Sequence, residues 1–412
     1  MTKHRLRAPS VSRLGDARMA TELGLASLLL PLGSFAANVV FARTLGASGR
    51  GDLAAVIAAL AVCEGVLVFG VPDILARHIA RGSLPTGAQR YLAMGAVTAS
   101  LIPGVLICLY CHSRHFAWPV AAVAGLVVPL TTALGLARGV LIGRQAFRRL
   151  AGSLIVAGAC RLVAPVVLLL VEHPTENLAL ILVLGWTVAP AVPIFASRPF
   201  AGTLCSGRDA WHILRESLGI WPAYLAWQVN SRLDQLVLSV FVSAADLGRY
   251  AVCVGIAEVP TFLANGPRQV VLARVSKSHN FTGVRGITLA IVALGAISGA
   301  LSASFAAPLL GAVFGPEFRS ASLVLGLLLA ATGFDLSAGL LTSCLVAVGR
   351  GRSASIAQLA GLSVTAIVLP IVLLLGGSIS SAAAVRLAAS ACTYLLALSN
   401  IRRFSRSEGA SR

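Results

Sequence analysis

The chain has 412 residues, of which 57% are hydrophobic and only 12% are charged, and its mean hydropathy is +0.87. Soluble domains carry about 25% charged residues, so this composition excludes a soluble globular protein, and it also excludes disordered, collagen-like and disulfide-scaffold chains. The formal net charge is +18. The basic residues lie in short connectors between apolar runs, without interleaved aromatic residues, which favours contact with anionic lipid headgroups over nucleic acid. We therefore expect membrane lipids, and no nucleic acid, as partners.

Apolar runs long enough to cross a membrane occur about twelve times, when a span is taken as roughly 20 residues. In chain order they cover residues 20–42, 52–75, 91–111, 117–138, 150–171, 178–196, 216–242, 247–272, 286–314, 321–348, 354–376 and 379–400. The connectors between them are short, so we expect no separate soluble domain. The expected class is an all-α polytopic membrane protein with about twelve transmembrane helices.

The distribution of Lys and Arg predicts the orientation of these spans. With an even number of spans, both tails and every second connector lie on one side, and that side collects 25 of the 33 basic residues. The opposite side carries five basic residues, which are Arg43, Arg50, Arg114, Arg249 and Arg319. The remaining three lie inside spans and are Arg161, Arg232 and Arg386. This asymmetry predicts that both termini are cytoplasmic, in the plasma membrane, with residues 43–52, 112–116 and 315–320 external.

Short repeated segments indicate that the chain is a duplication. Three pairs of similar segments occur in the same order, at offsets of 206, 205 and 197 residues: Val140–Arg144 with Val346–Arg350, Ala164–Leu170 with Leu369–Leu375, and Gly51–Ala54 with Gly248–Ala251. Both members of each pair lie on the same predicted side, which indicates parallel halves. We therefore expect two six-helix lobes at 20–205 and 206–400, flanked by basic cytoplasmic tails at 1–19 and 401–412.

No motif in the sequence indicates catalysis, a bound metal or a cofactor. A phosphate-binding loop, paired zinc ligands and a nucleophile elbow do not occur. Cys108, Cys111 and His112 formally match the attachment signature of c-type haem, at the outer end of the third span. Without a supporting context a motif this short arises by chance, and the sequence leaves open whether it is anything more. We expect a protein that is not an enzyme.

Ionisable residues inside the spans are the strongest functional signal, because each is costly in hydrocarbon unless it faces protein or water. Glu64 and Glu258 lie at similar depths in the second and eighth spans, and Asp335 lies at a similar depth in the tenth. A buried carboxylate that binds a proton in one conformation and releases it in another can couple transport to an ion gradient. These three residues are the candidates for ion coupling, with Asp335 in reserve. The alternative is that each forms a buried ion pair, for example with Arg161 or Arg232.

The seventh span is the most polar of the twelve expected. Gln228, Ser231, Arg232 and Gln235 share one helical face, and Asn230 and Asp234 lie on the adjoining one. A helix cannot present such a face to lipid, so this span lines either a cavity or a seam between helices. The breadth of the polar arc favours a cavity.

Several segments resemble the polysaccharide or O-antigen flippases, which belong to the superfamily of multidrug, oligosaccharidyl-lipid and polysaccharide exporters. They are Phe41–Ala54, Arg232–Leu238 with Leu247–Ala251, Phe314–Phe318, and Val348–Arg350. The resemblance implies a V-shaped pair of six-helix lobes around a central cavity lined by spans 1, 2, 7 and 8. It also implies movement of polyprenyl-diphosphate-linked sugars from the inner to the outer leaflet by means of an ion gradient.

This resemblance implies substrate contacts from spans 1 and 7. The candidates are Arg232, Asp234, Gln228 and Asn230 in span 7, and Arg43 and Asn38 in or beside span 1. The related lipid II flippases carry several cavity arginines, some of them in the first helix, whereas here Arg43 lies near the outer end of span 1. We therefore expect Arg232 to be the main contact with the diphosphate.

The expected function is a flippase for lipid-linked oligosaccharide in the biosynthesis of cell-surface polysaccharide, and polysaccharide-assembly proteins stay open as partners. A multidrug antiporter of the same superfamily is the first alternative, and it would need an acidic cavity instead of a cationic one. An integral-membrane polysaccharide polymerase or glycosyltransferase is the second, and such enzymes usually display a large outer loop or metal-binding acidic pairs.

Overall fold

The computed structural model describes residues 13–68, 70–84, 87–200, 207–261, 283–348 and 350–409. Every regular element in these ranges is helical, which confirms the predicted all-α class. The first seven helices are α1 (Arg13–Leu67), α2 (Val71–Ala80), α3 (Ala88–Ser113), α4 (Trp118–Gly143), α5 (Phe147–Leu170), α6 (Glu176–Val188) and α7 (Ala191–Phe195). The remainder are α8 (Gly207–Asn230), α9 (Leu233–Phe241), α10 (Ala244–Ala257), α12 (Val284–Phe314), the 3₁₀ helix η1 (Pro316–Ala321), α13 (Ser322–Ala347), α14 (Gly351–Leu374) and α15 (Ile379–Gly409).

Eight helices in the described ranges are long and apolar enough to cross a membrane, or nine if a pair bent by 47° is counted as one span. They coincide with the expected spans 3 to 6 and 9 to 12. The predicted number of twelve is therefore not confirmed. The four remaining expected spans are 1, 2, 7 and 8. Residues 262–272 of the eighth lie outside the described ranges, as do residues 1–12 and 410–412 of the predicted tails.

α1 is a hairpin of two antiparallel arms rather than one long rod. Gly46 has φ 68° and ψ −174°, a backbone conformation that side chains disfavour, and the chain reverses there. The Nε of Arg50 donates a hydrogen bond of 2.9 Å to Oδ1 of Asn38, twelve residues earlier. In a continuous helix those residues would be about 18 Å apart. The two arms therefore correspond to the expected spans 1 and 2, joined by a tight turn instead of a connector.

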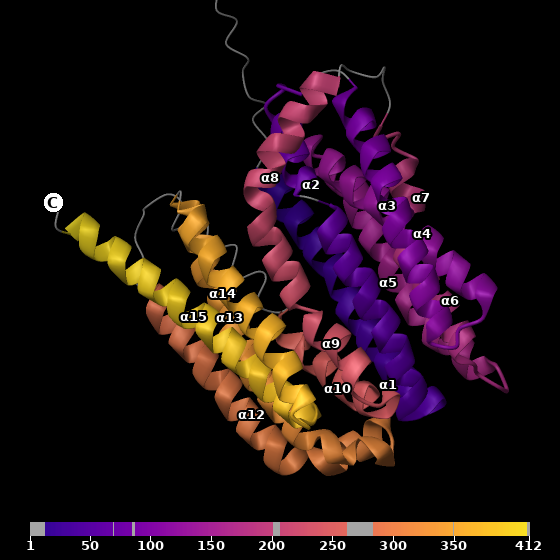
Figure 1. Ribbon diagram of the computed structural model, residues 1–412. Coiled ribbons are helices and arrows are strands. Elements are labelled where there is room, and N and C mark those ends of the chain that lie inside the picture. The colour runs from indigo at the N-terminus through magenta and orange to yellow at the C-terminus, as the bar shows by residue number, and fades with distance from the viewer. Residues whose placement is uncertain are drawn as a thin grey trace, which may run out of the picture.

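The helices form two groups that converge at one end and diverge at the other (Figure 1). Helices α3 to α6 pack on α1, and α2 and α7 pack on α4 in the same group. Helices α12 to α15 form the second group, with α8, α9 and α10 between the two. Glycines bring neighbouring helices close within each group: a Cβ on Gly104 or Gly125 would meet the carbonyl of the other, and Gly299 and Gly326 behave in the same way. Close crossings of this kind are typical of helices packed in membranes.

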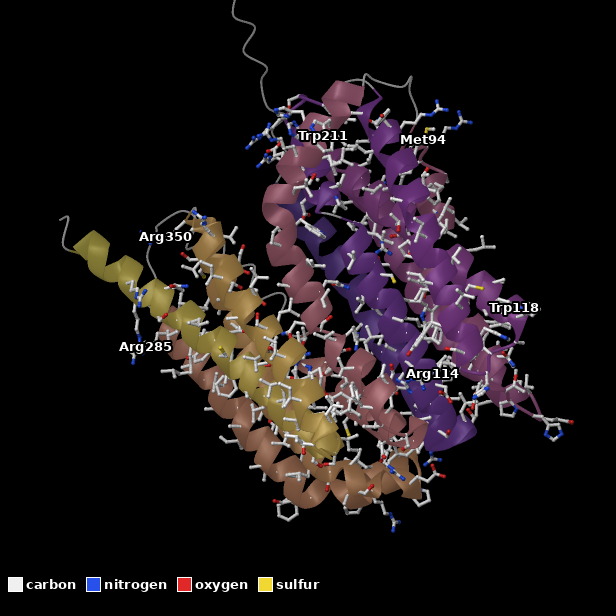
Figure 2. The ribbon with its side chains drawn as sticks, viewed as in Figure 1. Met94, Arg114, Trp118, Trp211, Arg285 and Arg350 are labelled. Carbon is white, nitrogen blue, oxygen red and sulfur yellow. The ribbon has the colours of Figure 1, made fainter. Side chains whose placement is uncertain are left out.

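Apolar side chains cover the outward faces of both groups, whereas charged ones gather at the ends. Ile102, Leu126 and Leu170 in the first group, and Phe305 and Leu309 in the second, are more than half exposed. Figure 2 shows Arg285 and Arg350 toward the diverging end of the molecule and Arg114 toward the converging end. A broad apolar belt between charged ends is the surface of a protein that spans a membrane.

Two glycines bring α1 close to α10 at the converging end. A Cβ on Gly51 would overlap the carbonyl of Ala244, and a Cβ on Gly248 would overlap the carbonyl of Ala47. The contact is reciprocal, because both pairs of positions, 47 with 244 and 51 with 248, differ by the 197 residues of the repeat offset. The start of α10 is fixed there by a cap, in which the Ser243 hydroxyl accepts from the backbone N–H of Asp246 at 3.1 Å.

Candidate functional site

The polar seventh span is broken where its charged residues lie. α8 ends at Asn230 and α9 begins at Leu233, so Ser231 and Arg232 occupy the break. A break in a helix leaves backbone carbonyls without their usual partners. The carbonyl of Asn230 is satisfied instead by a guanidinium N–H of Arg386 from α15, and the Asn230 side-chain oxygen accepts from Thr365 of α14 at 3.0 Å.

Arg232 in this break forms a two-point ion pair with Glu258, which ends α10. Its Nη1 lies 2.9 Å from Oε1, and its Nη2 lies 3.1 Å from Oε2. The side chains are 25% and 36% exposed, so solvent or a ligand can approach both. Arg232, predicted to bind substrate, and Glu258, predicted to couple transport to an ion, therefore bind each other. This is the ion-pair alternative that the sequence analysis left open.

A second charged cluster lies around Arg386. Its guanidinium is 3.0 Å from the carboxylate of Asp335 and 3.6 Å from that of Asp234. Asp234 is 2% exposed and also accepts a 2.6 Å hydrogen bond from the hydroxyl of Tyr250, which is fully buried. The predicted site residues Asp234, Asn230 and Asp335 thus meet in one network that fixes the break in the seventh span to α10, α13, α14 and α15. Arg386 was identified in the sequence only as a charge within a span.

A small cavity lies between the two charged clusters. Its polar lining consists of Ser231, Asp234, Glu258, Thr332, Asp335 and Arg386, and its volume is about 40 Å³. One water needs about 10–15 Å³ of such volume. The cavity therefore accommodates a few waters, and a diphosphate or a sugar requires the groups around it to move.

Asn38 of the first arm of α1 joins the same junction from the opposite side. It is buried, its Nδ2 donates to the carbonyl of Val252 at 3.4 Å, and its Oδ1 accepts from Arg50. Gly255 leaves room for it, because a Cβ there would overlap the Asn38 amide. Asn38 therefore links the two arms of α1 to α10.

Arg50 is the site residue that sequence reasoning missed. Its Nη1 is buried without a hydrogen-bond partner among the described residues, and the charge of Arg232 acts on it. The sequence analysis placed Arg50 in an external connector. The run of small residues after Gly46 could have indicated that Arg50 lies in a helix. Small residues permit a tight turn, so the second arm can begin before Arg50.

The other predicted residues lie around this junction. Gln228 packs on Gly65, where a Cβ would overlap its side chain, and the neighbouring Glu64 is half-buried and interacts electrostatically with Arg138 of α4. Arg161 donates to the Ser34 hydroxyl at 3.2 Å and lies 5.9 Å from the centre of the Trp186 ring. The suggested pairing of Arg161 with a carboxylate is thus replaced by a hydroxyl and an aromatic face.

Arg43 lies outside this junction, at the converging end. It donates to the carbonyls of Val313, at 2.7 Å, and Ala312, at the end of α12, and it lines a groove of about 480 Å³. In the same groove, Glu317 accepts a hydrogen bond of 2.9 Å from the backbone N–H of Ala47. Arg43 and Glu317 therefore connect the turn of α1 to the second group of helices.

The cysteine and histidine pattern near the end of α3 does not form a cluster. Cys111 is buried, and the His112 ring stacks on Trp118 with 4.5 Å between ring centroids. The described residues contain no group of three His, Cys, Asp or Glu side chains placed to hold a metal ion.

Two groups of membrane-crossing helices that meet at a charged, broken-helix junction define a multi-pass membrane transporter. The sequence model of the family described as polysaccharide biosynthesis protein matches residues 21–279, which is more than half of the chain. The chain therefore belongs to the polysaccharide biosynthesis protein family. No curated protein matches the sequence significantly.

Solved structures of transporters share the fold over nearly the whole chain. The lipid II flippase MurJ in an inward closed conformation superposes with a TM-score of 0.73 at 12% identity, covering 92% of this chain and 87% of its own. An inward-facing multidrug resistance transporter of the MATE family, in the MOP superfamily, gives 0.67 at 14% identity, covering 93% and 99%. A point mutant of the Vibrio cholerae MATE transporter VcmN gives 0.60 at 14% identity, covering 95% and 98%. The predicted all-α transporter fold is thus confirmed, and the division into six-helix lobes at 20–205 and 206–400 stays a prediction.

Proposed function

We propose that this protein is a flippase that carries lipid-linked oligosaccharide, with a polyprenyl diphosphate as the lipid carrier, across the plasma membrane for polysaccharide assembly. Both termini lie in the cytoplasm, and the protein transports without catalysing a covalent reaction. The observation that carries the proposal is the partly exposed guanidinium group of Arg232 in the break of the seventh span. Arg50 is tied to the same junction through its hydrogen bond to Asn38, which binds α10. Family membership and the fold shared with a lipid flippase support it.

The chemistry of arginine suits this cargo. A guanidinium presents parallel N–H donors that match two phosphate oxygens, and it stays charged at every physiological pH. Arg232 is the main contact in this proposal, with Gln228 beside it. Asn38, Asn230 and Asp234 position the arginines and the helix break, because their side chains are engaged by Arg50, Thr365 and Tyr250. Arg43 acts at the converging end.

Three carboxylates and one guanidinium line the small cavity, but each of these carboxylates lies within 4 Å of an arginine, and this pairing favours the flippase substrate over the cations that a multidrug antiporter carries. Such an antiporter needs carboxylates that are available to a cationic drug or a proton. Glu258 and Asp335 instead bind Arg232 and Arg386. Glu64, close to Arg138, is the remaining candidate for coupling to a proton.

Reconstitution of the full chain tests the proposal. Proteoliposomes that contain a polyprenyl-diphosphate-linked oligosaccharide with a labelled sugar are treated from outside with a glycosidase, and the protected fraction is followed with time. We expect the protein to expose the inner-leaflet pool and to leave ethidium, a cationic drug, unmoved. Movement of ethidium without movement of the oligosaccharide lipid would favour the multidrug antiporter.

A further inference from the structure

We propose that Glu258 is a displaceable occupant of an anion site formed by Arg232 and Arg50, and that a phosphate of the cargo takes its place during loading. The proposal rests on the proposed function, and it assigns to the carboxylate a role that is separate from ion coupling. Glu258 acts as an internal competitor that closes the site to weak anions.

The geometry of the ion pair supplies the first argument. Both carboxylate oxygens of Glu258 face both terminal nitrogens of Arg232, at 2.9 Å and 3.1 Å. A phosphate group presents two oxygens to an arginine in the same parallel arrangement. The carboxylate therefore occupies the position that a phosphate would use, and the two cannot bind Arg232 in this way together.

The charges around the pair supply the second argument. Arg50 adds a positive charge near this pair, because it binds Asn38, which packs on Gly255 about one turn before Glu258. The Nη1 of Arg50 is buried without an acceptor among the described residues. A buried donor without an acceptor is unfavourable, so an incoming oxygen would stabilise it. One carboxylate carries a single negative charge and leaves Arg50 uncompensated. A diphosphate carries more charge and more acceptors than Glu258, so it can satisfy both guanidinium groups.

The two ion-pair clusters differ in accessibility, which indicates the one that exchanges. Asp234 and Arg386 are 2% and 14% exposed, and Tyr250 and Asn230 hold them further. Asp335 of this cluster is 34% exposed, but its partner is the mostly buried Arg386. Arg232 and Glu258 are 25% and 36% exposed and bind each other. Partly exposed ion pairs contribute little to stability, so breaking the pair of Arg232 with Glu258 opposes the binding of a phosphate only weakly.

Equilibrium binding of a soluble polyprenyl diphosphate tests this exchange. The full chain is placed in nanodiscs of zwitterionic lipid, and the dissociation constant for farnesyl diphosphate is measured, with farnesol as the control for the apolar tail. Removal of the competitor should strengthen binding: we expect Glu258→Gln to bind up to about fivefold more tightly and Arg232→Gln to bind at least about tenfold more weakly. Glu258→Asp, whose shorter carboxylate reaches Arg232 less well, should give a smaller gain.

Two further variants separate competition from a general effect of negative charge. Asp246→Asn removes another carboxylate of α10 that binds an arginine, Arg249 at 2.7 Å, but it lies near the converging end, so the affinity should stay the same. The double variant Arg232→Gln/Glu258→Gln should bind no more tightly than Arg232→Gln alone, because the gain requires the freed guanidinium.

Each other outcome overturns the proposal. The size-exclusion profile of Glu258→Gln shows whether this variant is folded. If the folded variant binds as the native protein does, or more weakly, the carboxylate does not compete. Glu258→Asp should then show no gain in affinity either. A gain that persists without Arg232 shows an effect of net charge. If the native chain binds farnesyl diphosphate no better than farnesol, the diphosphate cargo of the proposed function fails as well. Native binding with no gain in Glu258→Gln rejects only the competitor.

Discussion

Arg232 binds Glu258 through two nitrogens at once. Because lysine cannot form this two-point contact, a conservative substitution tests its importance. Lysine keeps the positive charge but has no planar pair of donors. We expect Arg232→Lys to reduce polysaccharide export strongly, while the amount of protein in the membrane stays the same. Export can be measured as surface polymer in a strain that depends on this gene. Normal export by a stably inserted Arg232→Lys would remove this residue from the substrate contact.

The three carboxylates predicted for ion coupling differ in their neighbours, which predicts different effects of amide substitution. Glu258 and Asp335 bind arginines, whereas Glu64 lies near Arg138 without sharing the junction of Arg232. We expect Glu64→Gln to lose stimulation by a proton gradient while it still binds substrate, because the amide keeps the shape but removes the proton site.

Uptake into proteoliposomes with and without an imposed pH difference measures this effect, and Glu258→Gln is the matched variant. Proton coupling through these residues is rejected if both variants, alone and combined, respond to the gradient as the native protein does.

For single residues, the sequence predicted which side chains carry function better than it predicted the residues that they contact. Buried charges were recognised because they are costly in a membrane, and the possibility of an ion pair with Arg232 was already apparent. Arg386 was underestimated because its partners, Asp335 and Asp234, lie 51 and 152 residues away in the chain, and only the fold brings them together. Arg50 was misplaced because a charge next to glycines suggests a connector, whereas the turn at Gly46 is short.

Among the elements, α1 and α10 cross so closely that their backbones are in contact. Any side chain on Gly248 must displace the backbone of α1. Overpacking of this kind costs about 1–3 kcal/mol, so we expect Gly248→Val to lower the thermal stability of the detergent-solubilised protein. Gly95→Val in α3 is the control, because a Cβ there meets nothing within 4 Å. Equal melting temperatures for the two variants would contradict the importance of this crossing.

Helices that are continuous and apolar were predictable, and the interrupted ones were not. The expected spans 3 to 6 and 9 to 12 coincide with described helices because hydropathy over about 20 residues is the property that defines them. Hydropathy does not detect the reversal at Gly46, which depends on one backbone angle, or the break at Ser231 and Arg232, which depends on partners from α14 and α15. The elements that carry the site are therefore the ones that sequence reasoning described least well.

For the whole molecule, the asymmetry of positive charge predicts which end faces the cytoplasm. In a variant without native cysteines, Arg412→Cys should be protected from an impermeant thiol reagent in intact cells, and Ser320→Cys, exposed in η1, should react. Labelling of both after the membrane is opened shows that each cysteine is reactive. Labelling of position 412 from outside intact cells would reverse the orientation or change the number of spans.

Gly51 and Gly248 face each other as equivalent residues do across the two-fold axis of a homodimer. In such an isologous interface every substitution is present twice, whereas in a single chain each half can change alone. The position 197 residues after Arg50 is Leu247, which is fully buried. One half therefore supplies a cation where the other supplies a hydrocarbon side chain, although the glycines next to them still match. The two glycines thus keep the symmetry of the crossing. The neighbouring residues, Arg50 and Leu247, do not keep it, and this difference places a positive charge in only one half.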